Sequence, residues 1–204
     1  MAITYPLALP TTVKPAQIQI YASDVVAMSL SPFTMQQQVQ AHQGSLWRAD
    51  ITLPPMDRNE GDPWKAFLLA LGGRLGTFTM GDPRGTAPRG IATGTPLVKG
   101  AGQTGQSLIT DGWTINITGI LKAGDYLQIG SYLYVNLNDA NSNGTGDATL
   151  DIWPRLRSSP SDNAAITVKS AKGLWRLTSN ERSWLLGPGT NLYRGITFGA
   201  MEAI

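Results

Sequence analysis

Three glycines have a spacing that could do nucleotide chemistry. Gly100, Gly102 and Gly105 form a G-x-G-x-x-G pattern, which in dinucleotide-binding proteins opens a helix against the pyrophosphate. Residues 106–112 carry no helical stripe of apolar side chains. The same stretch approaches a phosphate-binding loop, but Gln106 stands where a lysine must reach the phosphates. We therefore expect a loop without nucleotide chemistry.

A second candidate is a loop whose oxygen-bearing residues match positions 1, 3, 5 and 9 of a calcium loop. These residues are Asp139, Asn141, Asn143 and Asp147. Gly144 fits position 6, but Leu150 stands at position 12, where a carboxylate should complete the shell. The flanking residues are typical of strands rather than helices. A polar hairpin loop is favoured over a cation site, and we expect no cofactor.

Acid–base catalysis has few candidates. His42 is the only histidine, and it falls on the outer face of an expected strand. Carboxylates cluster at turns and caps, and pairs such as Asp24 with Asp50 or Asp147 with Asp151 cannot be told from solvated charges. We expect a protein that is not an enzyme. A cell-wall hydrolase remains the weakest of three alternatives.

Composition narrows the function classes further. The 204 residues include no cysteine, which excludes disulfides and thiolate metal sites. The net charge of +2 is spread without a basic block, so we expect no specific binding of nucleic acid. No apolar run approaches the length of a membrane span, and the N-terminus lacks the pattern of a secretion signal. Abundant glycine (23) and proline (13) favour a strand-rich fold with many turns.

The candidate residues must be positioned by helices and strands, and residues 45–80 show the clearest pattern of such elements. Residues 45–53 alternate apolar and polar, as in a half-buried strand. Residues 62–71 then change to a helical period, with Asp62 as N-cap and Pro63 as the first helical residue. Residues 76–80 predict the next strand. The helix is too short to persist alone, so it must dock on a sheet.

Residues 33–42 alternate in the same way and predict a second strand, joined to 45–53 by a turn at residues 43–44. Short strands are also expected at 18–21 and 25–30. The predicted hairpin has a glutamine-rich outer face. Its candidate contact residues, for a subunit ring or a channel lumen, are Gln36, Gln38, Gln40 and Arg48. A solvated strand face is the open alternative.

The rest of the chain predicts a second module. Residues 86–95 are linker-like, and turn signals then recur every eight to twelve residues, as in a small barrel. The expected strands are 106–109, 113–117, 126–129, 132–137, 148–153 and 165–169. Residues 173–178 and 192–201 are strand-like again. We expect residues 92–172 to be an inserted β-barrel, and residues 1–91 with 173–204 to form one β domain with a packed helix.

Two stretches resemble a known family. The first contains Pro54 and Pro55, the helix residues from Trp64 to Leu68, and the Gly81-Asp82-Pro83 turn, and the second runs from Leu121 to Arg157. Both are similar to distal tail (tail hub) proteins of long-tailed bacteriophages. The resemblance implies a β-rich domain that closes as a hexameric ring around the tail lumen, with a peripheral β-module. Unlike that family, this chain shows no large C-terminal sandwich.

The resemblance also implies which partners the protein binds and where it is located. The expected partners are other copies of the chain, the tail tube protein and the tail-tip or baseplate hub proteins. The expected place is the tail tip of the virion, after assembly in the host cytoplasm. The alternative from another class is a carbohydrate-binding adhesin, in which Trp113 and Trp153 on the barrel would contact a host glycan.

Overall fold

A computed structural model describes residues 3–186 and 192–204. The chain is mainly β, with 42% of its residues in strands and 7% helical, as the sequence predicts. Contacts divide it into a hairpin unit, Pro10–Leu75 with Arg176–Glu202, and a barrel unit, Gly76–Trp175 with residues at both chain ends. These limits lie at other positions than the predicted domain limits, and the predicted division stays a prediction. Within the described ranges, no helix is long and apolar enough to cross a membrane.

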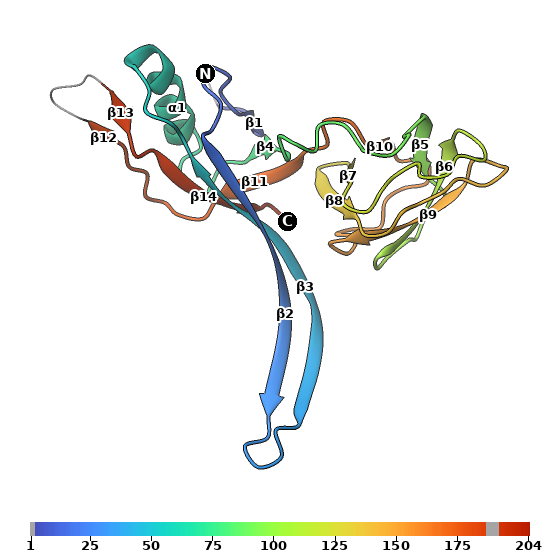
Figure 1. Ribbon diagram of the computed structural model, residues 1–204. Helices are drawn as coiled ribbons and strands as arrows, with labels where there is room; N and C mark the ends of the chain where they lie inside the picture. The colour runs from blue at the N-terminus through green and yellow to red at the C-terminus, as the bar shows by residue number, and fades with distance from the viewer. Residues whose placement is uncertain (1–2, 187–191) are drawn as a thin grey trace. The chain divides into compact units, whose positions relative to one another are not determined.

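The hairpin unit is built on two long antiparallel strands, β2 (Gln17–Leu30) and β3 (Gln37–Thr52). On its other edge, β3 pairs with β14 (Thr197–Glu202), but only through residues 48–52. Beyond β14 the two long strands continue as a two-stranded ribbon (Figure 1). Two short strands, β12 (Leu185–Leu186) and β13 (Tyr193–Arg194), pair with each other.

The predicted turn at residues 43–44 is wrong. β3 runs through these residues without ending, and the chain reverses at residues 31–36 instead. The two short strands expected at 18–21 and 25–30 are parts of the single strand β2. The hairpin is therefore formed by other partners than predicted, and it is longer.

The helix α1 (Arg58–Ala70) begins five residues earlier than predicted. Its N-cap is Asp57, whose side chain accepts a hydrogen bond from the Glu60 backbone N–H at 2.9 Å, while Glu60 accepts from the Asp57 N–H at 3.2 Å. This reciprocal capping box fixes the first turn. Asp62, the predicted cap, lies inside the helix together with Pro63.

The helix packs on the inner face of the sheet in the hairpin unit. Trp64 is fully buried, with its ring 5.9 Å from that of Phe67 and 6.2 Å from that of Phe198 on β14. The sheet contributes Trp47, Ala49 and Ile51, and all are buried. Burying each large apolar side chain stabilises the fold by about 1.5–3 kcal/mol, so this core holds the helix in place.

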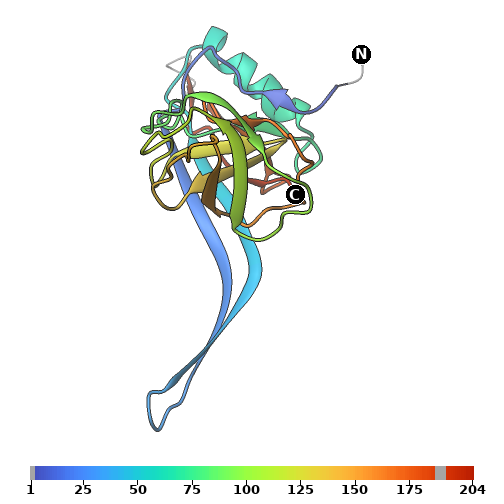
Figure 2. The same ribbon diagram turned by 90° about the vertical axis from the view of Figure 1, so that its right-hand side faces the viewer.

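The barrel unit contains a nearly closed sheet of six strands in the order β10-β7-β8-β9-β6-β5, and these strands curl around one interior (Figure 2). They are β5 (Gly94–Val98), β6 (Ser107–Trp113), β7 (Tyr126–Ile129), β8 (Tyr132–Asn136), β9 (Ala148–Trp153) and β10 (Ile166–Thr167). The edges meet where the Val98 N–H donates to the Ala164 carbonyl at 2.9 Å. The predicted small β-barrel is confirmed.

Two further strands and the first three residues of a third also belong to the barrel unit. β4 (Phe78–Met80) pairs parallel to β1 (Leu7–Ala8) and antiparallel to residues 173–175 of β11 (Gly173–Leu177). The Trp175 indole N–H donates to the Met80 carbonyl at 2.8 Å, which joins β11 and β4 through a buried side chain as well.

The segment 86–95, predicted as a linker, is held against the barrel. The Ile91 and Ala92 N–H groups donate to the Gly119 and Ile120 carbonyls at 2.9 and 3.0 Å. A Cβ on Gly90 would come within 2.4 Å of the Ile120 carbonyl oxygen, so only glycine permits this approach. Composition indicated a loop correctly, but it carried no sign of these backbone bonds.

Candidate functional site

The candidate site is the part of the ribbon farthest from the helix, which we call the distal hairpin (residues 24–45). Asp24 lies opposite Ser45, and the next aligned pair is Val26 with Ala41. Residues 42–44 of β3 therefore face Val25 alone, which adds two residues to β3 at a β-bulge. An addition of two keeps the side-chain alternation of both strands in step.

Register divides the distal hairpin into two chemically different faces. One, the apolar face, consists of Val26, Met28, Leu30, Val39 and Ala41 with Gln37 at its end. The other, the amide face, consists of Ala27, Ser29, Gln38 and Gln40. Both faces are exposed in the single chain. The sequence predicted the amide face, but it did not predict that the opposite face would be left uncovered.

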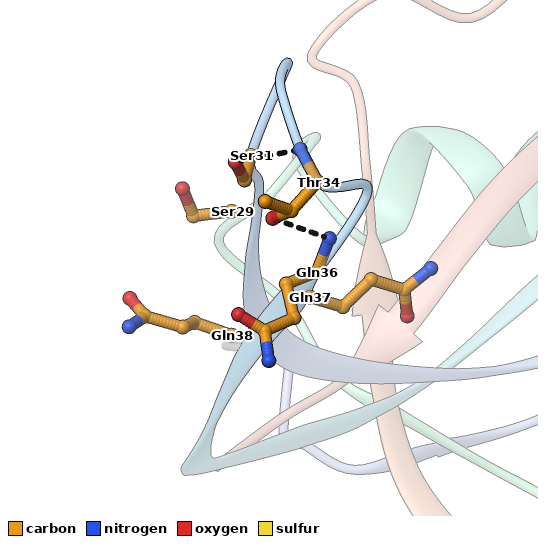
Figure 3. A pocket seen from close by; sticks show the side chains of 6 residues that line it. All are labelled: Ser29, Ser31, Thr34, Gln36, Gln37 and Gln38. Carbon is orange, nitrogen blue, oxygen red and sulfur yellow. Dashed lines mark hydrogen bonds between the residues drawn. The ribbon is translucent and has the colours of Figure 1, made fainter.

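The turn at the tip is held by its own polar groups (Figure 3). The Thr34 N–H donates to the Ser31 hydroxyl at 3.3 Å, and the Gln36 N–H donates to the Thr34 hydroxyl at 3.4 Å. Met35 takes the left-handed conformation (φ 56°) that closes the turn. Phe33 is 94% exposed. The tip therefore presents an aromatic ring on a polar turn.

The residues that line a shallow pocket at this turn all have side chains that carry a hydroxyl or an amide: Ser29, Ser31, Thr34, Gln36, Gln37 and Gln38. The three glutamine side chains extend from the turn in different directions (Figure 3). Within the described ranges, the side-chain amides of Gln36 and Gln38 make no hydrogen bond. The pocket can offer hydrogen bonds to a partner, and none of its six lining residues has an acidic or basic side chain that could activate a hydroxyl as a nucleophile.

The structure brings only some of the predicted contact residues together. Gln38, Gln40 and Arg48 share one face of β3, because they alternate in step along the strand. Gln36 lies in the turn rather than on this face. Gln36 and Arg48 are twelve residues apart, about 40 Å along an extended chain, so the four residues cannot form one compact site.

Arg48 lies in a second shallow groove, on the outer face of the sheet in the hairpin unit. The groove is lined by Tyr21, Ser23, Arg48, Asp50, Thr178 and Ala200. The Tyr21 hydroxyl donates to Asp50 at 3.0 Å, and this hydrogen bond is the main cause that raises the pKa of Tyr21. Among the described residues Arg48 has no ion-pair or hydrogen-bond partner for its guanidinium, which leaves it available for a contact.

The predicted loop at 139–147 uses its oxygens within the protein. Asp139 pairs with Lys122 at 2.8 Å, and Asp147 pairs with Lys99. These lysine hydrogen bonds are the main cause that lowers the pKa of each carboxyl group. Asn143 accepts from the Asp147 N–H at 2.9 Å. The polar hairpin loop favoured by the sequence therefore has a structural role, and the described residues contain no group of three or more metal-binding side chains.

The exposed position expected for Trp113 is wrong. Trp113 is 3% exposed and its indole N–H donates to the Thr110 hydroxyl at 2.8 Å, so its ring cannot stack on a sugar. Gly112, with φ 74°, interrupts the alternation of β6 and turns the next side chain inward. Trp153 is half-buried and lies at the opposite end of the paired strands β6 and β9. The two tryptophans therefore make no common platform.

The G-x-G-x-x-G glycines lie in the loop between β5 and β6 and lead into a strand, as the sequence predicted. All three have positive φ. The loop is organised by Gln103, whose side chain accepts from the Ile109 N–H at 2.7 Å and donates back to the Ile109 carbonyl at 3.0 Å. No protein-family model matches this chain, and the search of curated proteins found no match.

Proposed function

We propose that this chain is a structural, non-enzymatic component of a phage tail tip that assembles from identical copies into a closed ring. The ring would join the tail tube to the tail-tip or baseplate hub proteins of the host-recognition apparatus. The resemblance of residues 54–83 and 121–157 to distal tail proteins supports the virion assignment and the expected number of six copies. The barrel would project outward from the ring as the peripheral module.

One observation carries the proposal for assembly: a long ribbon of two strands is uncovered on both faces. β14 supports β3 only as far as Arg48, so the distal hairpin has no third strand among the described residues. An isolated two-stranded ribbon is marginally stable in water, and free strand edges favour pairing with other chains. Contact with further copies around a ring removes both liabilities.

The amide face can take part in this assembly. Gln38 and Gln40 are neutral, and their side chains make no hydrogen bond to any residue that the structure describes, which suits either the next copy or a water-filled lumen. Neutral amides would let a strongly charged polymer pass without binding it, in agreement with the expected absence of nucleic-acid specificity.

Removing the distal hairpin tests the proposal. Asp24 and Ser45 lie directly opposite each other, so residues 25–44 can be replaced by the two-residue turn Asn-Gly without changing the register. We expect the complete chain to form rings in electron micrographs, and the trimmed chain to remain folded as a monomer in light scattering. A monomeric complete chain at high concentration would refute the proposal, and so would a trimmed chain that still forms rings.

A further inference from the structure

The apolar face of the distal hairpin is unusually exposed. Val26, Met28 and Val39 are 54%, 63% and 62% exposed, and they lie together because Met28 is paired with Val39. Leu30 extends the row towards the tip, where Phe33 is exposed as well. Contiguous apolar surface of this kind marks interaction sites, whereas scattered apolar residues do not.

This face continues the core face of the same sheet. Nearer the helix, Trp47, Ala49 and Ile51 point to the side of β3 that α1 covers, and all three are buried. The bulge at residues 42–44 adds two residues and keeps the alternation, so Val39 and Ala41 belong to that same side. The ribbon therefore carries the pattern of a buried face beyond the point where its own chain covers it.

Charge indicates what covers this face. Residues 25–47 contain no aspartate, glutamate, lysine or arginine. A charged partner would find no complementary group there, whereas identical copies can meet through this segment without like-charge repulsion. The hairpin unit also carries a second exposed apolar group at the end of α1, Leu69 and Leu75. A head-to-tail contact requires two such different surfaces on one chain.

We propose that the apolar face of the distal hairpin packs on a second copy of this chain, while the amide face remains in water. This inference rests on the proposed ring and specifies which side of the hairpin forms the contact. The sequence indicates Gln38 and Gln40 as candidate contact residues, whereas this inference places the contact on the opposite face. In a ring, the amide face then lines the lumen or the outer solvent.

The absence of cysteine in the sequence permits a direct test. Single cysteines are placed on the apolar face by Met28→Cys and Val39→Cys, and on the amide face by Ser29→Cys and Gln38→Cys. Positions 28 and 29 are neighbours in sequence, as are positions 38 and 39, and all four positions are exposed, so the two sets are matched. The rate of maleimide labelling is measured in the assembled state and after dilution to monomer, with circular dichroism to verify the fold.

We expect assembly to slow labelling at positions 28 and 39 on the order of tenfold or more, because an interface core excludes water and solutes. Labelling at positions 29 and 38 should hardly change. Rings in which positions 28 and 39 stay fully reactive, or in which only 29 and 38 are protected, would overturn this inference and leave the ring intact. A monomer at every concentration would overturn both.

A lipid surface is the alternative partner for the apolar face, and the same cysteine variants test for it. Phosphatidylcholine vesicles are added to the diluted chain. Unchanged labelling at position 28 supports a second copy as the occupant. Protection at positions 28 and 39 by vesicles, in a chain that does not self-associate, would overturn the proposal.

Discussion

Asp62 accepts hydrogen bonds from three donors, and one of them, the Tyr193 hydroxyl, joins the helix to β13. It accepts hydrogen bonds from Lys65 at 2.8 Å and the Tyr193 hydroxyl at 2.6 Å, and a weaker one from Arg58 at 3.2 Å. The first two are the main causes that hold the pKa of Asp62 well below its usual value of 3.8. The hydrogen bond between Lys65 and Asp62 is also the main cause that raises the pKa of Lys65. The sequence suggested a cap at this position, but the carboxylate has a tertiary role.

This lowered pKa predicts a pH dependence of stability. Because the folded-state pKa of Asp62 lies below the unfolded one, its contribution is complete above about pH 4 and is lost as the pH falls further. We expect Asp62→Asn to lower the melting temperature at pH 7 and to flatten its decline between pH 5 and 2.5. Tyr193→Phe removes one donor and should have a smaller effect. Parallel wild-type and Asp62→Asn curves would contradict the assignment.

At the scale of elements, Asp125 attaches the segment 89–92 to the barrel. Its buried carboxylate accepts from the N–H groups of Arg89, Gly90 and Lys122 at 2.8, 3.0 and 2.8 Å. Asp125→Ala leaves these donors without their acceptor, which should lower the free energy of unfolding by about 1–3 kcal/mol. Asp111→Ala is the control, because the side chain of Asp111 makes no hydrogen bond or ion pair among the described residues. Equal losses in urea denaturation would contradict this role.

Strands with regular alternation were predictable from the sequence. The predicted strands 126–129 and 148–153 coincide with β7 and β9, because alternating side chains there line a closed interior. The helix was predicted, but its predicted start was wrong, because Pro63, the expected first helical residue, lies inside the helix. Asp57 and Glu60 have the spacing of a capping box and mark the true start. Sequence patterns therefore predicted the positions of helices and strands better than the residues at which they begin and end.

The hairpin could not be predicted correctly from turn chemistry. Gly44 is the only glycine between residues 1 and 60, and it suggested a turn where the structure has a bulge. The true turn is closed by Met35 in a left-handed conformation that methionine rarely signals. Gln38 and Gln40 were correctly placed together on one face. Their opposite face was missed, because the strand expected to pair with 33–42 was a different one.

At the scale of the whole molecule, the distribution of charge sets how assembly should respond to salt. The chain has a net charge of +2, and residues 25–47, which include most of the distal hairpin, contain no aspartate, glutamate, lysine or arginine. Contacts made through such a surface depend on apolar burial, which salt does not screen and which sulfate strengthens. A ring held by ion pairs would instead weaken as the ionic strength rises.

We therefore expect the assembled fraction to be unchanged between 50 mM and about 1 M sodium chloride, where the screening length falls to about 3 Å. It should increase in ammonium sulfate at equal ionic strength. Mass photometry at a series of protein concentrations measures the fraction directly. Met28→Ser should shift assembly to higher concentration in both salts, whereas Ser29→Thr on the amide face should not. Dissociation of the wild-type ring in sodium chloride would show that charged residues outside the hairpin, such as Arg48, carry the contact.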